Sequence, residues 1–365
     1  MGNTIKKTGV GIIGCGNISG IYLKNLTQVF DKVELVAVAD LDMARAEAKA
    51  AEFPPVKAMT VEQLLADPDI SVVVNLTIPL AHASVGKAIL QAGKSLYLEK
   101  PLSVCLADGE ELVRLAAQKN LRIGAAPDTF LGAGIQTCRK LIDDGWIGTP
   151  VGGSAFMLCG GHEGWHPDPE FYYKAGAGPM FDMGPYYLTA LTALLGPVKS
   201  LMGSAKKSFD QRTIGSQPKK GQTIEVDVPT HVSGILEFEG GASVTLTTSF
   251  DTIGGTSHVP IEIYGSEGTI QVPDPNTFGG PVRYRRKGSQ EWTEIPLLFG
   301  YAENSRGLGV ADLAKGLVEG TSHRADGALA LHVLEVMHGI HRSAETGQRY
   351  LVKNSCRRPQ ALDSK

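Results

Sequence analysis

The stretch Val10-Gly-Ile-Ile-Gly-Cys-Gly-Asn-Ile-Ser-Gly20 predicts the fold of the amino-terminal part of the chain. A short apolar run comes first, a glycine turn at Gly14 and Gly16 follows, and a segment with helical apolar spacing comes next. Strand, glycine turn and helix in this order form a dinucleotide site. Gly14 allows the tight turn, and Gly16 lets the backbone approach a pyrophosphate. The start of the helix, at Asn17 and Ile18, offers N–H groups and a partial positive charge to the phosphates.

The next predicted strand supports this site more strongly than the glycines do, because similar glycine turns also join ordinary strands and helices. The run Glu34–Asp40 predicts a second buried strand that ends at an acid. A carboxylate roughly 20 residues beyond the glycine turn accepts hydrogen bonds from the ribose hydroxyls of NAD. Asp40 and Asp42 repel the 2′-phosphate of NADP, so we expect NAD as the cofactor and favour NADP less.

The composition is that of an ordinary globular protein. Of the 365 residues, 42% are apolar and 20% are charged, and the net charge of −3 argues against a nucleic-acid partner. Five cysteines without a C-x-x-C pair indicate a reducing compartment rather than a disulfide framework. No apolar run is long enough to cross a membrane, and the N-terminus has no apolar signal segment. We therefore expect a cytoplasmic protein without a membrane partner.

The pattern along the chain predicts two domains. Residues 1–130 alternate between short apolar runs and amphipathic segments, which is typical of a doubly wound parallel sheet of the Rossmann type. Residues 131–365 predict an α+β domain built on a large, mostly antiparallel open sheet, because alternating strands follow one another at meander spacing. Within it, the helices expected in 305–346 pack back on the first domain. The open face of the sheet could cover a substrate or join copies in a homodimer or homotetramer.

Three smaller expectations concern the second domain. The polar segment Gln211–Thr223 predicts an exposed loop. The late histidines, His332 among them, lie on a predicted amphipathic helix and are expected at the surface or an interface. The spacing of His162 and His166 is weakly compatible with a metal, but their Gly-Pro context is not helical, so we expect no metal site.

Polar side chains follow several strands of the first domain. Asp40, Thr77, Glu99, Lys100 and Asp128 all come at the end of a predicted strand. Ligands of open parallel sheets bind beyond the carboxyl ends of the strands. The charge of Lys100 at such an end would stabilise the alkoxide-like oxygen formed when a carbinol loses a hydride. We expect Asp128 to touch the substrate.

Four motifs together resemble the Gfo/Idh/MocA family of glucose–fructose oxidoreductase, inositol dehydrogenase and related sugar dehydrogenases. They are the glycine turn with Asp40, the E-K-P motif at Glu99-Lys100-Pro101, the T-P-x-x-H-like stretch Asn75–His82, and Gly176–Tyr186, which is similar to G-G-G…D-x-G-x-H. The resemblance covers nearly the whole chain. It implies an NAD(P)-dependent dehydrogenase or reductase that acts on a carbohydrate, glycoside, cyclitol or other polyol. It also implies a cis bond before Pro101 and cofactor contacts from Thr77, Pro79, His82, Glu99 and Lys100.

The resemblance implies catalytic roles for Lys100, Asp182 and Tyr186. Lys100 polarises the reacting oxygen, and Asp182 anchors a neighbouring hydroxyl of the substrate. Tyr186 stands where the family pattern has its general acid–base histidine, and the pKa of a phenol is near 10 unless a cation lowers it. Either Tyr186 handles or relays the proton with Lys100 as that cation, or it only orients the sugar. In the second case His166 or a water takes the proton.

An aromatic stretch precedes this segment. We expect Trp165 at the cofactor and His166 at the substrate, although such a cluster serves domain packing equally well. Two alternatives to a dehydrogenase stay open. One is a redox-neutral sugar lyase or glycoside-cleaving enzyme that retains NAD, and the other is a non-catalytic regulator that binds NAD or a sugar. The intact E-K-P and D-x-G motifs count against the regulator, and the missing histidine counts for it.

Overall fold

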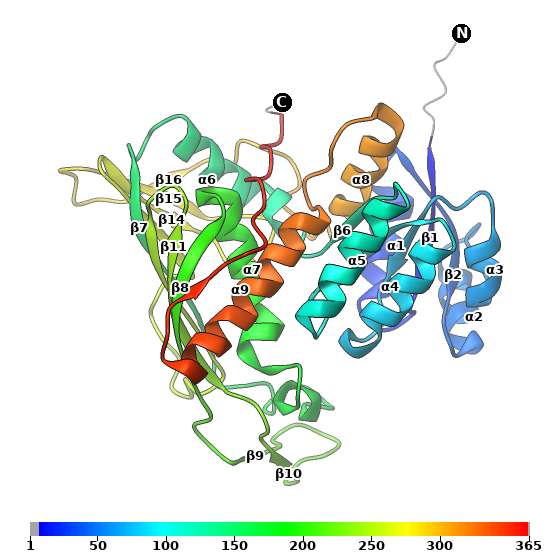
Figure 1. The fold of residues 1–365 in the computed structure, drawn as a ribbon, viewed down its shortest axis with the longest axis horizontal. Coiled ribbons are helices and arrows are strands. Elements are labelled where there is room, and N and C mark those ends of the chain that lie inside the picture. The colour runs from blue at the N-terminus through cyan, green and yellow to red at the C-terminus, as the bar shows by residue number, and fades with distance from the viewer. Residues whose placement is uncertain (1–6, 364–365) are drawn as a thin grey trace. The chain divides into compact units, whose positions relative to one another are not determined.

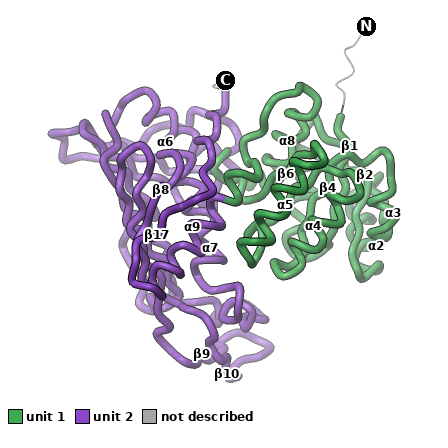
Figure 2. Tube along the Cα trace, in the orientation of Figure 1, with its two compact units in different colours: residues 1–131, 304–331 green, residues 132–303, 332–365 purple. Residues whose placement is uncertain are grey.

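The computed structural model describes residues 7–363. The chain forms two compact units, shown in green and purple in Figure 2. Unit 1 comprises residues 1–131 and 304–331, and unit 2 comprises residues 132–303 and 332–365. The carboxy-terminal helical region is therefore shared between the units, because only residues 304–331 of it belong to unit 1.

Unit 1 is built on a parallel sheet of six strands in the order β3-β2-β1-β4-β5-β6 (Figure 1). The strands are β1 (Thr8–Ile13), β2 (Val33–Ala39), β3 (Lys57–Ala58), β4 (Val72–Asn75), β5 (Ser95–Leu98) and β6 (Ile123–Ala125). This is the strand order of dinucleotide-binding sheets, and the order reverses between β1 and β4, where such sheets bind their ligand. The predicted parallel sheet of the Rossmann type is confirmed.

Helices connect the strands of this sheet. They are α1 (Ser19–Gln28), α2 (Met43–Glu52), α3 (Val61–Ala66), α4 (His82–Gln91) and α5 (Leu106–Gln118), with the 3-10 helices η1 (Pro79–Ala81) and η2 (Thr129–Leu131). Local side chains fix where several of them begin. The Asp42 carboxylate accepts a hydrogen bond from the Ala44 amide at the start of α2. Thr60 and Gln63 form a capping box at the start of α3.

The late segment 304–331 completes unit 1 with α8 (Leu308–Glu319). The Asn25 side chain donates hydrogen bonds to the carbonyls of Asn304 and Arg306 at 2.9 and 2.8 Å. An antiparallel bridge joins Gly124 in β6 to Asp326. These contacts tie α1 and the last strand of the sheet to a part of the chain that comes much later in the sequence.

Unit 2 is built on a nine-stranded sheet in the order β16-β15-β14-β13-β7-β12-β11-β8-β17. The strands are β7 (Pro150–Leu158), β8 (Val198–Lys206), β11 (His231–Phe238), β12 (Ser243–Ser249), β13 (Ile261–Gly265), β14 (Gly268–Val272), β15 (Val282–Arg286), β16 (Thr293–Ile295) and β17 (Tyr350–Leu351). Strands β7 and β12 run parallel, and the other neighbouring pairs are antiparallel. The predicted large, mostly antiparallel sheet is confirmed.

Three long helices belong wholly or mostly to unit 2: α6 (Ala133–Asp143), α7 (Gly178–Leu195) and α9 (Gly327–Thr346), while η3 (Glu170–Tyr173) is a short 3-10 helix. Helix α7 packs against β7, β11 and β12. Two arginines hold its carboxyl end, because Arg139 donates to the Ala193 carbonyl and Arg358 donates to the Leu194 carbonyl, both at 2.6 Å. Cations at this end also interact favourably with the helix dipole.

Two expectations for unit 2 are wrong. The segment Gln211–Thr223 is not simply an exposed loop, because its ends form the paired strands β9 (Gln211–Thr213) and β10 (Thr223–Glu225). His332 is fully buried rather than at the surface, and its ring lies between the Val198 amide and the Asn354 carbonyl. No helix within residues 7–363 is both long and apolar enough to cross a membrane.

Candidate functional site

The turn after β1 contains two glycines, and each is suited to its position for a different reason. Gly14 has a φ of +106°, and a Cβ there would lie 2.7 Å from the Leu76 carbonyl group at the end of β4. Gly14 therefore lets the two strand ends meet at the point where the strand order reverses. A Cβ at Gly16 would meet no other described atom within 4 Å. Packing within the protein therefore does not require a glycine at position 16. A glycine there is consistent with the close approach of a pyrophosphate to the backbone.

Asp40 follows β2 and supports the glycine turn directly. Its carboxylate accepts hydrogen bonds from the amides of Cys15 at 2.7 Å and Asp42 at 3.0 Å. The side chain stays partly exposed, so it can also accept from a ribose. The next residue, Leu41, was missed by the sequence analysis. Its side chain is fully exposed beside Asp40, which suits the flat apolar face of an adenine.

The stretch after β4 forms a connected turn. The Asn75 carboxamide oxygen accepts from the amide and the hydroxyl of Thr77, at 3.1 and 2.6 Å. Pro79 begins η1. His82 is fully buried, with Nδ1 2.7 Å from the Pro101 carbonyl and Nε2 3.0 Å from the Thr77 carbonyl, and burial lowers its pKa. His82 thus joins two predicted cofactor segments through their backbone.

The E-K-P motif directly follows β5, the fifth strand along the chain. Glu99 accepts from the Tyr22 hydroxyl at 2.8 Å and from the amide of Lys100 at 3.1 Å. Lys100 is partly exposed, and its bond to Pro101 is cis, as the resemblance implies. The Tyr22 contact links Glu99 to α1, so the motif is tied to the helix that starts at the glycine turn.

The structure gives Asp128 a task other than the predicted contact with substrate. Its carboxylate is buried and accepts from the amides of Gly307 and Gly309, both at 2.9 Å. These amides belong to the start of α8, where a negative charge is favourable. Burial raises the pKa of Asp128 to about 6 in spite of these hydrogen bonds. Asp128 is thus a helix-capping residue in unit 1.

In unit 2, the structure pairs Asp182 with a histidine that the sequence analysis had weighed only as a metal ligand. Helix α7 begins at Gly178, so Asp182 lies one turn inside it, and Tyr186 follows four residues later on the same face. The Asp182 carboxylate lies 3.2 Å from Nε2 of His162. Both side chains are mostly buried, with exposed fractions of 18% and 12%.

A buried ion network fixes the loop that carries His162. The Arg212 side chain is only 6% exposed and pairs with Glu163 at 2.6 Å and Asp251 at 3.1 Å. Arg212 also donates to the Phe250 carbonyl, and the Tyr173 hydroxyl donates to Glu163. The loop is therefore held by hydrogen bonds from Arg212 and Tyr173 to the Glu163 carboxylate, and Arg212 is in turn held by Asp251 and the Phe250 carbonyl.

Three other predicted residues lie near this pair in the sequence and remain candidates. Tyr186 is buried on α7. His166 is partly exposed, and its Nδ1 accepts from the Asp168 amide at 3.0 Å. Trp165 is 63% exposed, and its ring lies edge-on to the rings of His162 and His166.

Within each unit, the structure brings some of the predicted residues together. In unit 1, Gly14, Asp40, Thr77 and Glu99 all follow the carboxyl ends of neighbouring strands. In unit 2, Asp182 meets His162, which had no predicted catalytic role. No cluster of metal-ligating side chains occurs in the described part of the chain.

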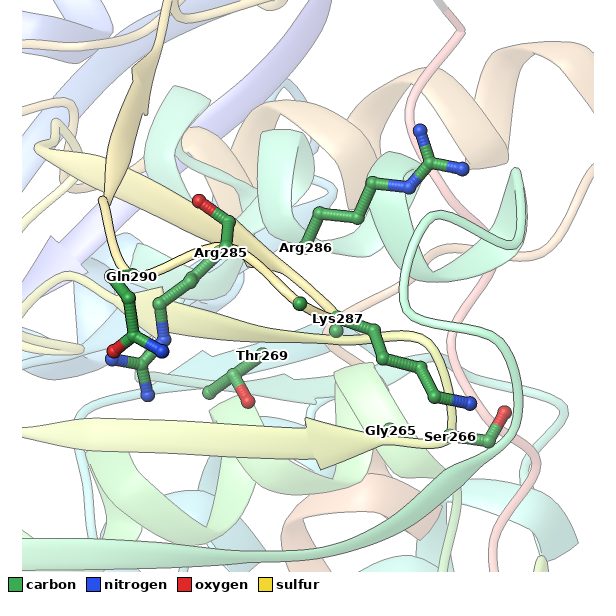
Figure 3. A pocket seen from close by; sticks show the side chains of 10 residues that line it. Gly265, Ser266, Thr269, Arg285, Arg286, Lys287 and Gln290 are labelled. Carbon is green, nitrogen blue, oxygen red and sulfur yellow. The ribbon is translucent and has the colours of Figure 1, made fainter.

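One pocket of about 340 Å³ lies elsewhere, at the turns that join β13 to β14 and follow β15 (Figure 3). Two of its cations have partners among the described residues. Lys287 lies 3.5 Å from Glu267, and the Arg285 guanidinium lies over the Trp292 ring. Arg286 extends away from the others in Figure 3. The cluster lies at the carboxyl end of β15, where Arg286 and Lys287 are exposed to solvent.

Comparison with known proteins matches both halves of the chain. The profile described as an oxidoreductase family with an NAD-binding Rossmann fold covers residues 8–126, and the profile of the GFO/IDH/MocA C-terminal domain covers residues 135–271. Residues 8–126 are therefore an NAD-binding Rossmann domain.

Individual relatives agree with these profiles. The dTDP-3,4-didehydro-2,6-dideoxy-alpha-D-glucose 3-reductase of Saccharopolyspora spinosa is 30% identical over 87% of this chain and 89% of its own. Inositol 2-dehydrogenase 3 of Saccharopolyspora erythraea is 26% identical over 78% and 79% of the two chains. A solved NAD-binding oxidoreductase from Klebsiella pneumoniae has a TM-score of 0.82 at 22% identity, over 95% of this chain and 99% of that chain. This last likeness shows a common fold.

Proposed function

Because this chain belongs to the Gfo/Idh/MocA family of oxidoreductases, we propose that it transfers a hydride between NAD and a hydroxyl or ketone of a carbohydrate, glycoside or cyclitol. The names of the relatives support this substrate class, because one is a reductase of a dTDP-linked deoxysugar and another is an inositol dehydrogenase. The bound nicotinamide supplies the hydride acceptor or donor, and the protein supplies the binding, orientation and charge.

Lys100 at the end of β5 is the observation that carries the proposal. Its backbone is held by Glu99, which is itself held by Tyr22 of α1. An ammonium group carried at the carboxyl edge of an NAD-binding sheet is suited to polarise the oxygen at which charge develops. In the direction of oxidation this oxygen is the alkoxide-like oxygen of the carbinol.

The side chains of unit 2 take the remaining roles in this proposal. Asp182 anchors a hydroxyl next to the reacting carbon, and Tyr186, one turn further along α7, orients the sugar or relays its proton. His166 and Trp165 belong to an aromatic cluster that suits the apolar face of a sugar and the edge of a nicotinamide.

NAD is preferred to NADP in this proposal because of Asp40. The carboxylate is partly exposed at the end of β2, and Asp42 adds a second negative charge two residues later. Arg45 lies 3.4 Å from Asp42 and is thereby engaged by an acid. A 2′-phosphate would thus meet carboxylates at this place, whereas ribose hydroxyls would find an acceptor.

The experiment mixes the purified protein with NAD or NADP and a panel of sugars, sugar acids, glycosides and cyclitols. Absorbance of the reduced nicotinamide is followed while products are identified. Steady formation of NADH with a ketone product supports the proposal. Product without net NADH would replace it with the redox-neutral lyase or glycoside-cleaving enzyme, and binding without turnover would replace it with the regulator.

The variant Lys100→Ala tests the catalytic role of the lysine. We expect kcat to fall by about a factor of 100 to 1000, the usual loss when a group that stabilises transition-state charge is removed. Binding of NAD, measured by calorimetry, should stay nearly unchanged. Full activity of this variant would rule out the assignment of Lys100.

A further inference from the structure

A histidine and a carboxylate on two different elements of unit 2 form a pair of which the proposed roles use only the carboxylate. His162 lies on the loop after β7, and Asp182 lies on α7, twenty positions later in the chain. Asp182 Oδ2 and His162 Nε2 are 3.2 Å apart. Since an ionised carboxylate can only accept, Nε2 carries the hydrogen and donates it.

This arrangement leaves Nδ1 as the basic nitrogen of the neutral ring. Within residues 7–363, no hydrogen bond joins Nδ1 to another group, and the side chain keeps 12% of its surface exposed. The rings of Tyr172 and Phe250 lie against the imidazole, with centroids 4.1 and 4.6 Å from its own. Nδ1 is thus the polar atom of a ring enclosed by aromatic walls.

The loop holds the imidazole in this orientation. The amide of His162 donates to the Tyr173 hydroxyl at 3.4 Å, and the next residue, Glu163, is bound by Arg212. A Cβ at Gly161 would come within 2.6 Å of the Arg212 guanidinium, so the chain turns tightly against this ion network. A base held by its neighbours in one orientation loses little entropy when it reacts.

From this geometry we propose that His162, oriented by Asp182, is the general acid–base group of the site. The proposal rests on the proposed function, because it names the proton carrier of that hydride transfer. Tyr186 stands where the family pattern has its histidine, and in this proposal His162, on the loop after β7, takes over that histidine's role. Histidine is the side chain most often used as a general acid or base, which favours His162 over Tyr186 as the proton carrier.

The step balances in protons and electrons. The hydroxyl proton of the substrate passes to Nδ1 of His162 while the hydrogen on the carbinol carbon leaves with its electron pair for the oxidised nicotinamide. The carbinol becomes a carbonyl, and NAD becomes NADH. Asp182 stabilises the imidazolium that forms, which then returns its proton to water.

The kinetic experiment uses the sugar that the wild-type protein oxidises in the panel. We expect His162→Gln to lower kcat by about 100 to 10,000 times, with a much smaller change in KM, and Tyr186→Phe to lower kcat by less than about tenfold. In His162→Ala, added imidazole should restore part of the rate. The matched control is His258→Gln, an exposed histidine whose ring contacts Phe156, and it should keep the wild-type kcat.

Two results of this experiment would overturn the proposal. One is a kcat for His162→Gln within tenfold of the wild type. The other is a large loss in Tyr186→Phe together with a small loss in His162→Gln, which would return the proton to the tyrosine. Absence of any turnover by the wild type is a failure of the proposed function and is seen before any variant is made.

A measurement that needs no turnover tests the pair separately. Nitrogen-15 chemical shifts of the His162 ring, assigned by comparison with His162→Gln, report which nitrogen carries the hydrogen. We expect the Nε2–H form at pH 8 in the wild type and a mixture of both forms in Asp182→Asn. An Nδ1–H ring in the wild type would contradict the proposal whatever the substrate is.

Discussion

Asp40 uses one carboxylate for two purposes. It accepts hydrogen bonds from the amides of Cys15 and Asp42, which shapes the turn after β1. It also places a negative charge where the ribose of a dinucleotide binds in this fold. A substitution that removes the side chain would disturb both, so a test of cofactor preference must keep the shape and change only the charge.

The variant Asp40→Asn is this test. We expect the ratio of kcat/KM for NAD to that for NADP to fall on the order of tenfold or more, which corresponds to about 1.4 kcal/mol, because a repulsion against the 2′-phosphate is lost. The thermal midpoint of the protein without cofactor should fall somewhat, since the carboxamide oxygen can accept from only one of the two backbone amides that the carboxylate holds. An unchanged ratio would mean that another group selects the cofactor.

At the scale of single residues, the sequence predicts the roles that depend on neighbouring residues in the chain. Gly14 and Asp40 are recognised because a strand, a turn and a helix adjoin them, and their fit to the dinucleotide turn follows from this order. The pairing of His162 with Asp182 joins a loop to a helix twenty positions apart, and no periodic pattern marks it. His332 was expected at the surface, but β8 and the segment after β17 cover it.

Among the elements, α8 depends on a buried acid. Burial raises the pKa of Asp128 to about 6, whereas an unfolded aspartate has a value near 3.8. Between these values the folded protein holds a proton that the unfolded chain has released. The stabilisation is therefore complete below about pH 3.8 and is lost as the pH rises through about 6.

This linkage predicts a pH-dependent difference between the wild type and Asp128→Asn. The difference between these two pKa values corresponds to at most about 3 kcal/mol in the free energy of unfolding. From pH 4 to pH 7 the free energy of unfolding of the wild type should decline relative to that of the variant. Urea midpoints at pH 4, 5.5 and 7 measure the difference, and parallel curves for the two proteins would show that Asp128 does not titrate in this window.

The loop of His162 depends on Arg212, whose charge is balanced by Glu163 and Asp251 in a buried place. We expect Arg212→Met to lower the free energy of unfolding by about 3–5 kcal/mol, because it leaves two buried carboxylates without a cation. Chemical denaturation measures the loss. The control is Lys219→Met, which removes a more exposed lysine paired with Asp168 and Glu170 and should change little. Equal effects of the two variants would contradict this account.

The sequence best predicts those helices and strands whose apolar spacing and end signals both lie within the segment itself. The apolar spacing of 308–319 and its flanking glycines are typical of a helix, and α8 spans these residues. Strands β14 and β15 belong to the expected run of alternating strands. The sequence did not predict the strands β9 and β10. Arg212 of β9 is buried because it pairs with Glu163 and Asp251, which lie far from it in the sequence, and a local pattern does not mark such contacts.

At the scale of the whole molecule, we expect copies of the chain to associate through the exposed face of the large sheet. Ile235 of β11 and Met202 of β8 are register partners, and their side chains are 52% and 40% exposed. The variant Ile235→Glu should raise the dissociation constant of a dimer by about tenfold or more, because it places a charge in an apolar contact.

Light scattering after gel filtration, over a range of protein concentrations, measures this association. Val318→Glu is the matched control, because Val318 is 43% exposed but lies on α8 of unit 1. A wild type that stays monomeric, or an assembly that Ile235→Glu leaves intact, would exclude this face as the interface.

Ribosomes deliver the two parts of unit 1 at different times, because residues 304–331 leave the exit tunnel long after β6. Translation adds about 5–20 residues each second, so the roughly 170 residues of unit 2 between these parts delay the second by about 10 to 30 seconds. During this interval Asp128 has no α8 amides to bind, and the Ile123 carbonyl has no His323 beside it. The nascent sheet must wait for α8, so we expect its uncovered apolar surface to bind chaperones during synthesis.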